Sequence, residues 1–66
     1  MQLVNTILSE SPNTPIKVEV YEDKDLFFIK CYISGVHSST QNGYLNRGIA
    51  EAAARQWISS VKVLHG

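Results

Sequence analysis

The clearest pattern of hydrophobic and polar positions lies between residues 46 and 61. Apolar side chains recur there at intervals of three and four residues, as on one face of an α-helix: Ala50, Ala53, Ala54, Trp57, Ile58 and Val61. Asn46 is a good N-cap candidate, and Glu51 precedes Arg55 by four residues on the polar side. The pattern predicts an amphipathic helix whose apolar face covers another element.

Two segments before this helix alternate between apolar and polar side chains. In "IKVEVY", residues 16–21, every second residue is apolar, and "LFFIKCYIS", residues 26–34, continues the same period of two. The short polar stretch "EDKD" between them predicts a turn, and therefore an antiparallel hairpin. A less regular third strand is predicted within "VHSSTQNGYL", residues 36–45.

Residues 2–9 are predicted to form a short helix. Leu3, Val4, Ile7 and Leu8 are spaced as on one helical face, and prolines at 12 and 15 would end the helix. The predicted fold is therefore α+β, a two-layer α-β-β-β-α domain over residues 1–66. Its three-stranded antiparallel sheet would carry both helices on one face.

Composition narrows the classes of function. The chain has 66 residues, and its six Lys and Arg balance its six Asp and Glu, so it lacks the basic excess typical of nucleic-acid binders. No apolar run approaches the roughly 18 residues of a membrane span, and the first residues lack signal-peptide features. The single cysteine, Cys31, excludes an internal disulfide. We expect an intracellular location, with no membrane association.

Two segments together resemble the double-stranded RNA-binding domain family. "FFIKCYISG" matches the F-x-V-x-V-x-V-x-G appearance of that family's second strand, and "AEAAARQWI" follows with the A-x-x-A-A pattern of its last helix. The chain length and the predicted order of elements also resemble the family. The matching positions are mostly core residues, so they speak for the fold more than for the activity.

The resemblance implies non-catalytic binding of double-stranded RNA by shape. The last helix would present its N-terminus to phosphates, the first helix would present polar groups to a minor groove, and the first loop would enter the next groove. The RNA-binding residues implied in this way are Arg47, Asn46, Gln2, Asn5, Ser9 and Lys24.

The chain departs from the family pattern at that surface. The first loop is short and acidic and lacks the G-P-x-H motif, and of the family's paired lysines only Arg47 keeps the charge, because Gly48 follows it. Duplex affinity depends on the number of phosphates neutralised, so we expect weak binding.

The alternative is a protein-interaction or dimerisation module that has lost much of the RNA surface. Its contact residues would lie on the sheet face opposite the helices: Tyr21, Phe28, Lys30 and Tyr32. The same aromatics could instead only stabilise neighbouring strands, and stacking of single-stranded bases on them has little basic support. An inhibitor of another enzyme would show the same features.

No catalytic or cofactor site is predicted. Cys31 falls on the core side of its strand, where a small hydrophobic residue is expected, and the two histidines have no ligands at zinc spacing. No Ser-His-Asp arrangement or glycine-rich phosphate loop occurs. We therefore expect a binding protein without a cofactor.

Overall fold

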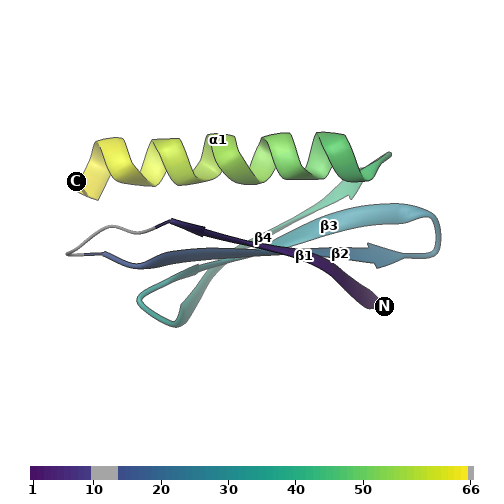
Figure 1. Cartoon of the computed structure of the whole chain (residues 1–66), viewed down its shortest axis with the longest axis horizontal. Coiled ribbons are helices and arrows are strands. Elements are labelled where there is room, and N and C mark those ends of the chain that lie inside the picture. The colour runs from purple at the N-terminus through teal and green to yellow at the C-terminus, as the bar shows by residue number, and fades with distance from the viewer. Residues whose placement is uncertain (10–13, 66) are drawn as a thin grey trace.

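Four strands and one helix follow one another along the chain in the computed structural model, which describes residues 1–9 and 14–65. The elements are β1 (Gln2–Ser9), β2 (Ile16–Asp23), β3 (Leu26–Ile33), β4 (Val36–Tyr44) and α1 (Arg47–His65). The strands form one antiparallel sheet in the order β1-β2-β3-β4, and α1 runs along one face of it (Figure 1).

Two tight turns set the register of the three consecutive strands β2, β3 and β4. Lys24 and Asp25 join β2 to β3, and Ser34 and Gly35 join β3 to β4; all four have positive φ. Positive φ at both central residues is the mark of a type I′ turn, whose twist matches that of the flanking strands. The predicted hairpin and the predicted third strand are both confirmed.

The predicted first helix is wrong, because residues 2–9 form β1. A bulge in the pairing with β2 falls between Leu3 and Asn5, with Val4 as the extra residue. The bulge places Val4 and Ile7, three positions apart, on the side of α1, while the exposed Leu3 and Leu8 lie on the opposite side, so the apolar doublets imitate helical spacing. Val4, Thr6 and Ile7 are β-branched and favour a strand. The break expected at Pro12 lies outside the described residues.

The two-layer α-β-β-β-α arrangement is therefore also wrong. The observed fold is α+β, with four strands and one helix over the residues that the structure describes, and so it is not the arrangement of a double-stranded RNA-binding domain. Because only one helix is present among the described residues, the opposite face of the sheet has no covering element there.

The core lies between α1 and the two central strands, β2 and β3. Its buried side chains are Ile16, Val18, Val20, Ile29, Cys31, Ala50, Ala54, Ile58 and Val61. Ala50 and Ala54 are fully buried, so short side chains occupy the positions where the helix meets the sheet most closely. Trp57 lies half-buried at the edge of this core.

Candidate functional site

The sheet face turned away from α1 gathers the four residues predicted for protein contact. In the β2–β3 register Tyr21 is opposite Phe28, Glu19 is opposite Lys30, and Lys17 is opposite Tyr32. Residues opposite each other in an antiparallel pair share a face, and the buried residues alternate with these on the helix side. We call the set Lys17, Glu19, Tyr21, Phe28, Lys30 and Tyr32 the open face.

The aromatic rings of the open face are packed against neighbours on their flat sides. Tyr21 and Phe28 stack with ring centroids 5.1 Å apart and planes 11° from parallel. The Lys30 ammonium lies 5.2 Å from the Tyr21 ring centroid, and the Lys17 ammonium lies 4.7 Å from that of Tyr32. Such cation–π contacts stabilise a sheet surface through the attraction between the ammonium charge and the ring quadrupole, which offsets the entropy lost as the side chains become ordered.

A carboxylate at the middle of the open face joins these groups. The Tyr21 hydroxyl donates a hydrogen bond of 2.9 Å to Glu19, and the Lys17 ammonium lies 3.6 Å from the same carboxylate. Partial desolvation is the largest single effect on Glu19 and would raise its pKa. Hydrogen bonds from Tyr21 and Tyr32, together with the Lys17 charge, outweigh it and bring the pKa below its ordinary value.

The two tyrosines of this network respond in the opposite direction. The hydrogen bond to Glu19, followed by burial, raises the pKa of Tyr21. Desolvation, followed by the same carboxylate, raises the pKa of Tyr32. Both hydroxyls therefore stay protonated at neutral pH and act as donors, while Glu19 stays ionised and acts as an acceptor.

The strand β4 extends the open face with two residues that the sequence did not indicate. His37 is opposite Tyr32, and their rings meet edge to face with centroids 5.7 Å apart. The His37 imidazole also lies 2.8 Å from the Thr40 hydroxyl, at hydrogen-bond distance. The irregular register of β4 hides these positions in the sequence, and only the turn at Ser34 and Gly35 could have indicated that His37 returns beside Tyr32.

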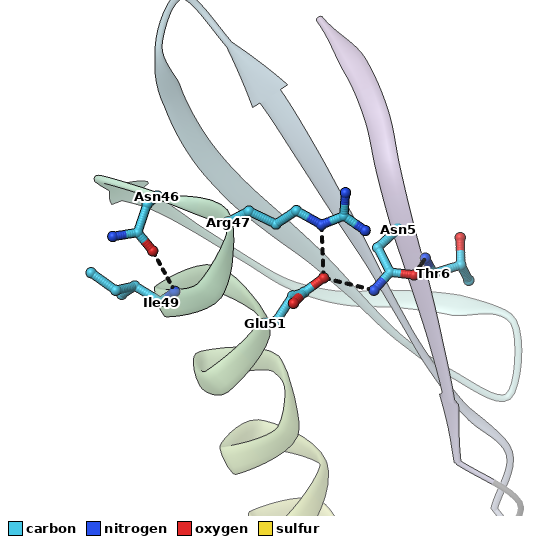
Figure 2. Close-up of polar contacts among 6 residues, drawn as sticks. All are labelled: Asn5, Thr6, Asn46, Arg47, Ile49 and Glu51. Atoms are coloured by element: carbon cyan, nitrogen blue, oxygen red, sulfur yellow. Dashed lines mark hydrogen bonds and ion pairs between the residues drawn. The ribbon is translucent and has the colours of Figure 1, made fainter.

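Two of the residues implied for RNA contact, Arg47 and Asn5, meet instead on one carboxylate (Figure 2). The Arg47 Nε donates to Glu51 at 2.9 Å, and the Asn5 side-chain amide donates to the same oxygen at 2.8 Å. The Asn5 side-chain oxygen Oδ1 accepts a hydrogen bond of 2.8 Å from the backbone amide of Thr6. Arg47 first, then Asn5, lower the pKa of the Glu51 carboxyl. This cluster fastens the start of α1 to β1.

The other residues implied for RNA contact do not all lie together, because Asn46, Lys24 and Gln2 lie toward one end of the sheet and Ser9 lies at the other. Asn46 is the N-cap of α1, because its side-chain oxygen accepts from the Ile49 amide at 2.9 Å, as its sequence position predicted. Lys24 is in the β2–β3 turn, and Gln2 is exposed at the opposite end of β1 from Ser9. The Ser9 hydroxyl oxygen is buried. The structure therefore does not bring these six residues onto one surface.

Cys31 lies in the core and is fully buried. Desolvation raises the pKa of its thiol to about 11, which suppresses the reactive thiolate at neutral pH. Within residues 1–9 and 14–65, no group of three or more His, Cys, Asp and Glu side chains is placed to hold a metal ion. No helix in the described part of the chain is long and apolar enough to cross a membrane.

Comparison of the chain with models of protein families, with curated proteins and with solved structures gives no match.

Proposed function

We propose that this protein is a non-catalytic module that binds a protein partner through the open face. The observation that carries the proposal is the grouping of Tyr21, Phe28 and Tyr32 with Lys17 and Lys30 on a sheet face that α1 does not cover. Aromatic side chains that are already ordered lose little conformational entropy on binding, which makes them effective contact residues.

The orientation of the rings favours a protein over nucleic-acid bases. A base stacks on the exposed flat side of an aromatic ring. Here Phe28 and the Lys30 ammonium lie against the Tyr21 ring, and the Lys17 ammonium lies over the Tyr32 ring. Rings whose flat sides are partly occupied in this way suit the apolar contacts of a protein interface better than the stacking of bases.

The charges indicate the chemistry of the partner surface. Lys17 and Lys30 place two positive charges on the open face, whereas its one carboxylate, Glu19, is already engaged by Tyr21, Tyr32 and Lys17. A complementary surface would have apolar side chains at its centre and carboxylates at its rim. Rim pairs of this kind contribute more to the association rate and to specificity than to affinity.

Duplex RNA binding stays a prediction, with less support than protein binding through the open face. Its contact residues would be Arg47, Asn46, Gln2, Asn5, Ser9 and Lys24. The fold that suggested it is absent from the described residues, and Arg47 and Asn5 contact Glu51. Lys24 is next to Asp23 and Asp25, which oppose the approach of phosphates.

The test is a selection of binding peptides from a random library, with three baits: the wild-type chain, Tyr32→Glu and Arg47→Glu. The proposal predicts enriched peptides that combine apolar residues with Asp or Glu. These peptides should bind wild type and Arg47→Glu equally and lose binding to Tyr32→Glu, which replaces an aromatic side chain of the open face with a negative charge that repels their carboxylates. Peptides that bind all three baits alike would refute the open face as the docking surface.

A parallel titration separates the RNA prediction from this proposal. The duplex RNA has about 20 base pairs, because a double-stranded RNA-binding domain spans about 16 base pairs. It is titrated at two salt concentrations, with the DNA duplex of the same sequence as a control. RNA-selective binding that weakens with salt and is lost in Arg47→Glu would support duplex recognition instead.

A further inference from the structure

The two edge strands of the sheet differ from the central strands in charge. β2 carries Lys17, Glu19, Glu22 and Asp23, and β3 carries Lys30. The edge strands β1, with sequence QLVNTILS, and β4, with sequence VHSSTQNGY, carry no Asp, Glu, Lys or Arg. Proteins usually place charges or prolines on exposed edges, because a bare edge invites another strand to pair with it.

The two edges differ in regularity. In β1, the residues from Asn5 to Ser9 pair with β2 in five consecutive steps without a shift. In β4, irregularities interrupt the pairing with β3 on both sides of a run of three residues, Ser39 to Gln41. Bulges of this kind disturb an edge and discourage further pairing. β1 is therefore the edge that can accept another strand.

The outer side of β1 has no strand beside it in the described part of the chain (Figure 1). Along any strand the backbone N–H and C=O groups point alternately to the two sides. The outer edge of β1 therefore presents a row of N–H and C=O groups with the spacing that matches the backbone of another extended segment. Leu8, opposite Lys17, is 69% exposed on the side of the sheet away from α1, so an apolar side chain is available beside this edge.

We propose that two copies of this chain join through β1, antiparallel and centred on Ile7, into one continuous sheet. The regular run from Asn5 to Ser9 has Ile7 at its middle, so a two-fold pairing that uses the whole run places Ile7 opposite Ile7. Thr6 of each copy is then opposite Leu8 of the other. The absence of charge along β1 makes this strand compatible with itself, because no like charges meet.

The helices leave room for this arrangement. α1 packs over β2 and β3, so four strand spacings separate the two helix axes, roughly 19 Å at the usual spacing of about 4.8 Å. A helix with its side chains is about 10–12 Å wide, so the two helices do not collide. The two-fold axis is perpendicular to the sheet, and both open faces lie on the same side of the dimer.

A dimer through β1 does not depend on the proposed function, but it would affect how the open face binds a partner. Two open faces side by side would bind a bivalent partner more tightly than a single face would, through a raised effective concentration. The β1 pairing can be tested without any partner.

A charge-swap experiment tests both the dimer and its register. Thr6 and Leu8 are exposed, so the fold tolerates charged residues there. The variant Thr6→Lys/Leu8→Lys would set like charges directly opposite each other twice across the two-fold axis. The variant Thr6→Lys/Leu8→Glu would set opposite charges there instead. Molar mass is measured by sedimentation over a wide range of protein concentration, with circular dichroism as a check of the fold.

The expected result is a wild-type dimer that dissociates on dilution, a monomeric double-lysine variant and a dimeric Lys/Glu variant. From the usual size of cross-strand charge effects, the dissociation constants of the two variants should differ by about tenfold or more. A wild-type chain that stays monomeric at every concentration overturns the proposal. Equal dissociation constants for the two variants overturn it as well.

Cysteine cross-linking checks the register directly. In the proposed pairing, Ile7→Cys brings two thiols together at the Cα separation of opposed strand residues, about 4.5–5.5 Å, within disulfide range. Thr6→Cys is the matched control, because its two copies would be diagonal neighbours about 7–8 Å apart. Mild oxidation should cross-link Ile7→Cys and leave Thr6→Cys largely monomeric; the reverse result would refute the register. Cys31 is fully buried and stays out of this reaction.

Discussion

The stacked pair Tyr21 and Phe28 offers a quantitative test of the open face. The two residues are opposite each other in the β2–β3 register, and their rings lie 5.1 Å apart at 11°. Aromatic pairs of this geometry contribute about 0.5–1.5 kcal/mol beyond the apolar area they bury. The double-mutant cycle consists of Tyr21→Leu, Phe28→Leu and the combined variant, each of which keeps an apolar side chain on the sheet.

The combined variant should lose less stability than the sum of the single losses, by about 1 kcal/mol. In a chain of this size that difference corresponds to about 4–8 °C in Tm. The Lys30 contact with the Tyr21 ring cancels in the cycle, because both variants at Tyr21 remove it.

Thermal and urea unfolding, followed by far-UV circular dichroism and by Trp57 fluorescence, provide the measurement. A control cycle pairs Phe28→Leu with Tyr32→Leu, which are about 13 Å apart along β3 and should be additive. A coupling energy between Tyr21 and Phe28 below about 0.3 kcal/mol, no larger than that of the control, would show that the rings do not stack in solution.

Four further predictions concern single sites. Asn46→Ala removes the N-cap of α1 and should cost about 1 kcal/mol in thermal unfolding, whereas Asn46→Asp should cost much less. Glu51 has a lowered pKa, so its contribution to stability is present above its ordinary value of 4.5 and is lost as the pH falls through the lower folded value. The Tm of Glu51→Gln should therefore decline less over that range than wild type does, and parallel curves would contradict the ion pair. Cys31 should react with a thiol reagent at pH 8 only after unfolding, because burial raises its pKa to about 11; fast native labelling would contradict its core position. Asp25→Gly should raise stability by about 0.5–1 kcal/mol, since φ is 67° there, and Asp23→Gly in β2 should lower it.

The local pattern of the sequence is enough for the elements that carry a regular period. Alternation, capping and helical spacing predict the strands at 16–21 and 26–34 and the helix after Asn46, and the structure contains all three. The period of two by itself also assigns Tyr21, Phe28, Lys30 and Tyr32 to one face of the sheet.

The segment from residue 2 to residue 9 could not be predicted in this way. The bulge at Val4, together with the exposed apolar residues Leu3 and Leu8, makes its strand pattern look helical, and the pairing with β2 decides the outcome. A segment this short has too few internal hydrogen bonds to be stable as an isolated helix. The error at β1 then carried over to the fold class.

For each regular element, the spacing of apolar residues in the sequence is enough to determine which face is buried. Only the tertiary structure decided how distant residues meet. Asn5 and Glu51 are 46 positions apart and form a hydrogen bond, and Arg47 donates to the same carboxylate. These side chains therefore stabilise the fold, whereas from the sequence alone they could equally have been free to bind a ligand. The physical reason is that local propensity acts over one or two turns of chain, whereas register and the partners of charged groups depend on the closed sheet as a whole.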